Sequence, residues 1–141
     1  KEVEHMPYLR DYHILISHSW SYNNHYKTIK DWLDNTGYFK FSNYSVCCDK
    51  PLDTKTNDEL KQALTNRISA CSCVIVVSGM YTSYSKWIDY EIDEAIRFGK
   101  PIIGLRPWGQ ERVPSKILNN ATVMVGWNRD SLISAIRQYA L

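Results

Sequence analysis

The run Cys73-Val-Ile-Val-Val-Ser78 decides the fold that this sequence predicts. Its apolar residues, mostly β-branched, follow one another without polar alternation, which is typical of a strand buried on both faces of a parallel sheet. Gly79 and the polar residues up to Ser85 end the run. We therefore place residues 73–78 at the centre of a sheet and interpret the flanking sequence outward from them.

Four predicted elements precede this central run. Tyr12-His-Ile-Leu-Ile-Ser17 has the same apolar character and predicts a second buried strand. Apolar residues then recur near the helical period, which predicts a helix over about 23–36 that ends at Gly37. The weaker run Tyr44-Ser-Val-Cys-Cys48 predicts another strand, and a helix is expected over about 57–70.

The same alternation continues after the central run. A helix is predicted from Ser83 to Phe98, closed by Gly99. The remaining predicted elements are a strand over 100–105, a short helix near 114–118, a strand over 122–127 and a last amphipathic helix from Asp130.

Strands that alternate with helices predict a single α/β domain of the flavodoxin-like, doubly wound kind. Parallel strands need crossover connections, and crossovers are right-handed almost without exception. We therefore expect a five-stranded parallel sheet in the order 2-1-3-4-5, with helices on both faces. The chain changes direction between the first and third strands, so a ligand is expected in the crevice at their carboxyl ends.

Length and composition fit one domain. The chain has 141 residues, of which 44% are hydrophobic and 23% charged, enough for one core. Residues 1–6 end in His5-Met6 and are interpreted as a tag remnant, which leaves 7–141 as the domain. A net charge of +2 with mixed signs does not favour nucleic acid as a partner. No apolar run approaches the roughly 20 residues of a membrane span, so a cytoplasmic protein that does not bind membranes is expected.

The four cysteines occur as Cys47-Cys48 and as Cys71 and Cys73. Neither spacing matches the two-residue gap that is usual in zinc sites, so no metal site is expected. We interpret the four thiols as small apolar groups that stay reduced in the cytosol.

One acidic residue of the predicted 83–98 helix lies in an unusual position. The apolar stripe of this helix is formed by Ile88, Ile92, Ala95 and Ile96, and its solvent side by Asp89, Tyr90, Asp93 and Arg97. Glu91 falls on the flank of the stripe, one turn after Trp87, and is expected to be half-buried beside the crevice. Such a carboxylate is either catalytic or part of a structural salt bridge. Candidate partners for the salt bridge are Arg10, Arg67 and Lys86.

Several stretches of this sequence resemble TIR (Toll/interleukin-1 receptor) domains. Ser85-Lys-Trp-Ile-Asp-Tyr-Glu-Ile92 and Gly99-Lys-Pro-Ile-Ile103 are similar to the third helix and fourth strand of that family, where a Trp precedes the catalytic Glu by four residues. Together with Ile14-Leu-Ile-Ser-His-Ser-Trp20 and Gly126-Trp127, they are most similar to the ThsB-type TIR proteins of the bacterial Thoeris antiphage system. The resemblance covers residues 12–139.

This resemblance implies an enzyme that uses NAD as its substrate and needs no cofactor. Glu91 would contact the nicotinamide ribose while the bond to nicotinamide breaks, stabilising an oxocarbenium-like sugar. Attack by water would make the protein an NAD glycohydrolase. Attack by a hydroxyl of the adenosine side would make it an ADP-ribosyl cyclase, whose cyclic ADP-ribose isomer would activate a separate effector protein. TIR enzymes also commonly self-associate.

Side chains around the crevice are candidates for binding NAD. These candidates are Ser17, His18, Ser19, Trp20, Ser83 and Trp87. Hydroxyl groups suit ribose and phosphate, tryptophans suit stacking on a base, and histidine suits a phosphate. Core packing remains an alternative for both tryptophans, and a plain surface position remains one for the histidine.

The rival interpretation is a TIR-like module that binds proteins and performs no chemistry. Other functions on this fold are disfavoured by missing motifs. The sequence has neither a Gly-x-Ser-x-Gly elbow nor a Gly-x-Gly-x-x-Gly loop, which argues against serine hydrolases and dehydrogenases. A phosphoacceptor receiver would need an Asp at the end of the central run, where this chain has Ser78.

Overall fold

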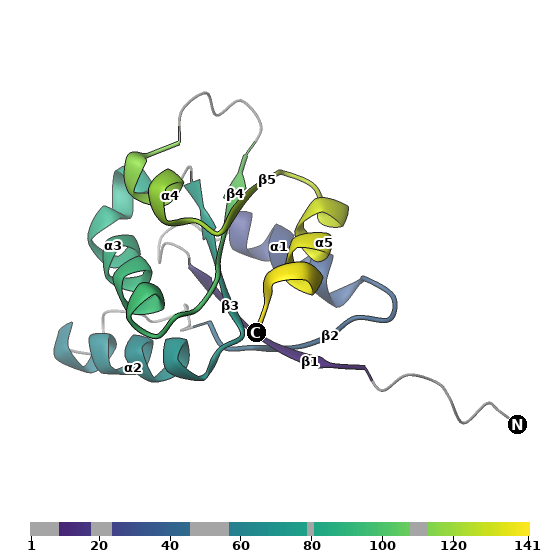
Figure 1. Ribbon diagram of the computed structural model, residues 1–141, viewed down its shortest axis with the longest axis horizontal. Coiled ribbons are helices and arrows are strands. Elements are labelled where there is room, and N and C mark those ends of the chain that lie inside the picture. Colours follow the sequence, from purple (N-terminus) through teal and green to yellow (C-terminus); the bar gives the residue numbers. More distant parts are fainter. Residues whose placement is uncertain (1–8, 18–23, 46–56, 79–80, 108–112) are drawn as a thin grey trace, which may run out of the picture.

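The computed structural model describes residues 9–17, 24–45, 57–78, 81–107 and 113–141, with only the backbone described at 24, 57 and 81–86. Five parallel strands form one sheet in the order β2-β1-β3-β4-β5 (Figure 1). The strands are β1 (Asp11–Ser17), β2 (Lys40–Asn43), β3 (Cys73–Val77), β4 (Ile102–Arg106) and β5 (Val123–Gly126). The predicted doubly wound sheet and its strand order are confirmed.

Helices cover both faces of this sheet. They are α1 (Asn24–Asp34), α2 (Asn57–Ala70), α3 (Tyr81–Arg97), α4 (Ser115–Asn120) and α5 (Arg129–Tyr139). Helices α1 and α5 pack against each other on one face, while α3 contacts α2 and α4 on the other (Figure 1). None of the helices in the described part of the chain is long and apolar enough to cross a membrane.

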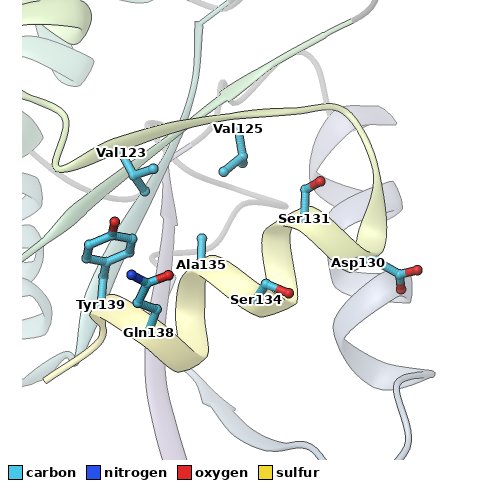
Figure 2. Close-up of a pocket in the computed structure, with 8 residues that line it drawn as sticks. All are labelled: Val123, Val125, Asp130, Ser131, Ser134, Ala135, Gln138 and Tyr139. Carbon is cyan, nitrogen blue, oxygen red and sulfur yellow. The ribbon is translucent and has the colours of Figure 1, made fainter.

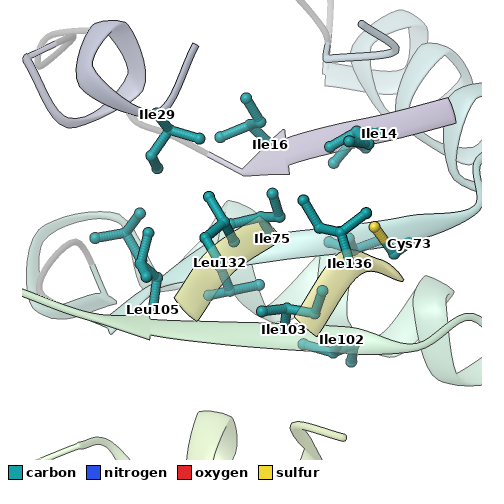
Figure 3. Close-up of a cluster of buried hydrophobic side chains, with 14 of the residues drawn as sticks. Ile14, Ile16, Ile29, Cys73, Ile75, Ile102, Ile103, Leu105, Leu132 and Ile136 are labelled. Atoms are coloured by element: carbon teal, nitrogen blue, oxygen red, sulfur yellow. The ribbon is translucent and has the colours of Figure 1, made fainter. Parts of the chain in front are cut away.

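The main core lies between the sheet and the α1–α5 pair. Ile14 and Ile16 of β1 and Ile75 of β3 point toward Ile29 of α1 and Leu132 of α5 (Figure 3). All five side chains are at most 1% exposed. Each such aliphatic group contributes about 1.5–3 kcal/mol when it is fully buried. Because β3 is buried along its whole length, it is the centre of the fold, as its sequence predicts.

Strand β2 lies earlier in the chain than the predicted 44–48 segment. Residues 40–43 pair with residues 11–14 of β1, and Tyr12 stacks on Phe39 with ring centroids 5.3 Å apart. Tyr44 donates its backbone N–H to Ile14 at 2.7 Å, just beyond the strand. The predicted position was wrong for residues 44 and 45, and residues 46–48 lie outside the described part. The described β2 is a short edge strand, stabilised by aromatic pairs rather than by a run of β-branched residues.

The apolar stripe of α3 is narrower than predicted. Ile88, Ile92 and Ala95 are buried, but Ile96 is 51% exposed. The buried side of α3 is centred on the first three residues and extends toward Glu91 instead, so Ile96 lies beyond the opposite flank. Helix α3 ends as expected at Gly99, whose φ of 68° is favourable for glycine.

Cys71 and Cys73 are buried free thiols. Burial raises the pKa of Cys71 to about 11. Burial, together with the neighbouring Cys71, raises the pKa of Cys73 to about 12. Both thiols are therefore protonated and unreactive near neutral pH, which agrees with their interpretation as small apolar groups. Cys47 and Cys48 lie outside the described residues.

The two isoleucines of α3 allow the position of the core to be tested. We expect Ile92→Ala to lower the free energy of unfolding by about 2–5 kcal/mol, because it leaves a cavity under α3. Ile96→Ala makes the same chemical change one turn later, at an exposed site, and should shift the free energy by less than about 0.5 kcal/mol. Urea denaturation followed by circular dichroism measures both. Equal losses would contradict the described burial.

Candidate active site

The carboxyl end of β1 presents Ser17 to the face of the sheet that α3 covers. Ile14 and Ile16 point toward α1 and α5 (Figure 3), so the alternation of side chains along a strand directs Ser17 to the opposite face. The backbone of Ser17 is in register with Val76 of β3. The residue is 1% exposed. Ser17 therefore lies at the predicted crevice between the first and third strands.

Glu91 reaches the same point from the third turn of α3. It is 6% exposed, which is more buried than the half-buried position that its sequence predicts. The Ser17 hydroxyl donates a hydrogen bond to Glu91 Oε1. The structure thus brings together two of the predicted site residues, which lie 74 positions apart in the sequence.

Burial changes the acidity of this carboxyl group. The loss of hydration raises the pKa of Glu91 to about 7, against an ordinary value of 4.5. The hydrogen bond from Ser17 acts in the opposite direction, because it favours the charged form. Near neutral pH, Glu91 therefore exists both as a neutral acid and as a carboxylate. Perturbed carboxyl groups of this kind are concentrated at functional sites.

Two of the three candidate partners for a structural salt bridge with Glu91 contact aromatic rings instead. The guanidinium group of Arg10 lies over the ring of Tyr12 at 4.5 Å. That of Arg67 lies over the ring of Tyr44 at 5.9 Å. Among the described residues, no basic side chain forms a salt bridge with Glu91 or lowers its pKa. The side chain of the third candidate, Lys86, lies outside the described part.

The described contacts of Trp87 are with Tyr90 and a shallow hollow rather than with the Ser17–Glu91 pair. Its ring is half-buried and meets the ring of Tyr90 edge-on, with centroids 6.4 Å apart. It borders a shallow hollow of about 200 Å³ whose other lining residues are Lys61, Asp89, Tyr90 and Asp93. The structure therefore does not bring Trp87 and Glu91 into one described cavity. The predicted NAD contact of Trp87 remains a prediction.

The other predicted binding residues fall outside what the structure describes. His18, Ser19 and Trp20 follow β1 in the 18–23 segment, and of Ser83 only the backbone, in the first turn of α3, is described. Their roles stay predictions. In the described part of the chain, no group of three or more His, Cys, Asp and Glu side chains is arranged to hold a metal ion.

Ser78 is a further candidate for the site, whereas from the sequence it was used only to argue against a phosphoacceptor receiver. It follows β3 directly and is fully buried. It lies two residues after Val76, which is in register with Ser17. Two buried hydroxyl groups therefore lie at the carboxyl ends of the two central strands. The signal was present in the sequence, because both apolar runs end in serine.

A second hollow lies between β5 and α5, on the opposite face of the sheet from Glu91. Figure 2 shows its lining, which includes Val123, Val125 and Ala135 together with polar groups of α5. Its volume is about 390 Å³. No catalytic pair is evident among the residues that line it, so the Ser17–Glu91 pair is the stronger candidate site.

Comparison with known proteins relates this chain to one family. A family model described as the TIR-like domain of the Thoeris protein ThsB matches residues 15–112. The matched region runs from β1 to beyond β4 and includes both Ser17 and Glu91. No sequence among the curated proteins matches the chain.

Solved structures share the fold at low sequence identity. The CMP N-glycosidase BcmB of Clostridium botulinum is 17% identical, with a TM-score of 0.55 over 90% of this chain and 99% of its own. A conserved protein from Enterococcus faecalis V583 is 11% identical, with a TM-score of 0.60 over 92% and 99%. A prokaryotic SEFIR domain is 14% identical, with a TM-score of 0.51 over 91% and 95%. These likenesses show a common fold.

The raised pKa of Glu91 makes the stability of the protein depend on pH. The folded state binds the Glu91 proton more tightly than the unfolded state does, so stability falls as pH rises from about 4.5 to about 7. Glu91→Gln removes the free-energy cost of burying a charged carboxylate. We expect it to raise the free energy of unfolding at pH 8 by about 1–3 kcal/mol. At pH 4.5 the two proteins should differ little.

Denaturation of both proteins at the two pH values measures this effect. Asp93→Asn is a suitable control, because it neutralises an exposed carboxylate of the same helix whose surface salt bridge to Lys116 contributes little. A Glu91→Gln variant less stable than the wild type at pH 8 would argue against an uncompensated buried carboxylate.

Proposed function

This chain belongs to the family of the TIR-like domain of the Thoeris protein ThsB, and on that basis we propose that it is an enzyme that cleaves NAD and releases nicotinamide. In this proposal Glu91 is the catalytic residue. The observation that carries it is the buried Glu91 carboxyl group, held by Ser17 at the carboxyl ends of the central strands. Ligands of doubly wound sheets bind at this edge.

The chemistry suits a single carboxylate. The bond that breaks joins C1′ of the ribose to the positively charged ring nitrogen of nicotinamide, and both electrons leave with the ring. Nicotinamide departs as a neutral molecule, so no general acid is needed, while the ribose gains oxocarbenium character. A carboxylate beside C1′ stabilises that developing positive charge, as in other glycosyl transfers.

The burial of Glu91 strengthens this stabilisation. In a poorly hydrated site a carboxylate interacts with a nearby positive charge more strongly than it does in water. The positive charge of the bound nicotinamide ring also favours the ionised form of Glu91. The cost of burying the carboxylate in the free protein is then offset when the substrate binds and reacts.

One structural neighbour supports the class of reaction. The Clostridium botulinum protein BcmB is described as a CMP N-glycosidase, and an N-glycosidic bond is also the bond that links nicotinamide to ribose in NAD. The common fold extends over 90% of this chain. The choice of NAD as the substrate rests on the family relationship rather than on this neighbour.

The fate of the ribose completes the proposal. Water attacking C1′ and losing a proton gives ADP-ribose, whereas a hydroxyl of the adenosine side that does the same gives a cyclic ADP-ribose isomer. We favour the cyclic product, acting as an immune second messenger on a separate effector protein in the cytoplasm, because the resemblance to ThsB-type TIR proteins implies such a signal. Self-association of the domain is part of the same proposal.

A protein-binding module without chemistry is the alternative, and it leaves Glu91 unexplained. A buried carboxyl group with a raised pKa destabilises the folded domain at neutral pH. An interaction module would gain stability from an apolar or amide side chain at this position. A residue that destabilises the fold is more typical of a catalytic site than of an interaction surface.

Incubation with NAD tests the proposal directly. We expect the concentrated wild-type protein to release nicotinamide and Glu91→Gln to be at least about 10²-fold slower, because the neutral amide cannot stabilise a cationic ribose. Asp93→Asn should retain full activity. Chromatography with mass detection follows nicotinamide and separates ADP-ribose from its cyclic isomer.

Two results would contradict the proposal. One is a Glu91→Gln variant that is as active as the wild type. The other is the absence of turnover by the concentrated protein, even after addition of an extract of phage-infected cells as a trigger.

The pH dependence of the reaction should follow the ionisation of Glu91. Because only the carboxylate stabilises the ribose cation, kcat/KM for NAD should rise with pH and reach half of its plateau near pH 7, the pKa to which burial raises Glu91. Initial rates between pH 5 and pH 9 measure the profile. A plateau that is already complete at pH 5 would mean that Glu91 is ionised throughout and that its burial does not control the reaction.

A further inference from the structure

Ser17 is held in place more firmly than its position at the end of a strand requires. Its backbone is in register with Val76 of β3, and the preceding residue, Ile16, donates its N–H to Ser45 Oγ at 2.8 Å. The side chain of Ser17 has a single rotatable bond to its hydroxyl oxygen. The sheet therefore limits this oxygen to three staggered positions, and in one of them it donates to Glu91.

The hydroxyl of Ser17 contacts one oxygen of Glu91 and leaves the other available. An ionised carboxylate only accepts hydrogen bonds, so the Ser17 hydroxyl is the donor to Oε1. Oε2 receives no hydrogen bond from the described part of the chain, and it is not among the fully covered polar atoms that lack a partner. Glu91 keeps 6% of its surface exposed, and Oε2 is its carboxylate oxygen without a described hydrogen bond.

We propose that Ser17 is a positioning residue for Glu91, with a hydroxyl that holds Oε1 and so presents Oε2 to the reacting ribose. This inference rests on the proposed function and gives Ser17 a role other than the direct contact with ribose or phosphate that its sequence position predicts. A long glutamate side chain has several rotamers, and a fixed donor selects one of them. Selecting the reactive geometry in advance is a large part of enzymatic rate enhancement.

Among the described groups near Glu91, the Ser17 hydroxyl is the one that favours the charged form of its carboxyl group. From α2, Lys61 lies over the ring of Tyr90 at 5.7 Å. From α4, Lys116 pairs with Asp93 at 2.7 Å. Of the other charged groups, Arg67 lies over Tyr44, Glu94 pairs with Arg97, and Asp11 accepts from Ser42. Asp89 of α3 keeps one carboxylate oxygen without a described partner. The causes that act on the pKa of Glu91 are burial and the Ser17 hydroxyl.

A purely structural role for Ser17 makes a different prediction. If the hydrogen bond only tied α3 to β1, its removal would lower stability and leave the acidity and geometry of Glu91 unchanged. If Ser17 contacted the substrate instead, its removal would raise KM with little change in kcat. A positioning residue changes the titration of Glu91 and lowers kcat, while KM stays nearly constant.

The chain offers a matched control for this distinction. Ser42 of β2 donates its hydroxyl to Asp11 at 2.8 Å, near the start of β1. Ser42→Ala therefore removes a different serine–carboxylate hydrogen bond, one that joins β2 to the start of β1, away from Glu91. Ser17→Thr is the conservative variant, because it retains a hydroxyl at the same branch point.

The experiment follows the Glu91 carboxyl carbon by NMR in protein labelled with ¹³C-glutamate, with Glu91→Gln used to assign the signal. We expect Ser17→Ala to raise the apparent pKa of Glu91 by about one pH unit and Ser42→Ala to leave it unchanged. Ser17→Thr should titrate nearly as the wild type does. At plateau pH, kcat for NAD cleavage should fall about 10-fold in Ser17→Ala, with KM within about 2-fold.

The titration judges this inference independently of NAD cleavage. An unchanged Glu91 titration in Ser17→Ala would overturn it, and so would a raised KM with normal kcat. A shifted titration in a protein that does not cleave NAD would support the Ser17–Glu91 contact and reject the proposed function alone. If Ser17→Ala fails to fold, Ser17→Thr decides, because a hydroxyl that still holds Oε1 must preserve both the titration and kcat.

Discussion

All five strands of this domain run in the same direction, and the remaining features of the structure depend on that constraint. Parallel neighbours can be joined only by crossovers, so every strand is followed by a segment that returns over a face of the sheet. The helices cover both faces as a result, and β3 is buried completely. The carboxyl ends of all strands lie along one edge. Ser17, at the end of one of the two central apolar runs, therefore meets Glu91 of helix α3 at this edge.

Helix α3 has two sides with different functions. One side packs on the sheet through Ile88 and Ile92 and carries Glu91 next to Ser17. The other side contacts α2, where the hydroxyl of Tyr90 lies 2.6 Å from that of Thr65. Trp87 leans toward this second side, with its ring against Tyr90. Trp87 and Glu91 thus lie one turn apart on the helix but have different described contacts: Trp87 meets Tyr90, and Glu91 meets Ser17.

Burying the Glu91 carboxyl group beside Ser17 lowers the stability of the folded domain at neutral pH. The free energy needed to bury a carboxyl group is reflected in the pKa of about 7 that burial gives Glu91. A single neutral donor compensates for part of this cost, and no cation in the described part of the chain lowers the pKa further. The arrangement leaves the carboxylate poorly stabilised until a positive charge approaches it. In the proposed function, the cationic ring of NAD and the cationic sugar that develops from it supply that charge.

Local sequence determined the alternation of strands and helices, the order of the sheet, and the flank position of Glu91, because these depend on periodicity and on the geometry of crossovers. Residues 57–70, for example, are helical as their pattern predicts. Tertiary structure decided the rest. Strand β2 begins at Lys40 because of its pairing with β1. Ile96 is exposed because the buried side of α3 is centred closer to Glu91, and Glu91 accepts a hydrogen bond from a hydroxyl 74 residues away. Burial and hydrogen-bond partners come from distant segments, so no local pattern specifies them.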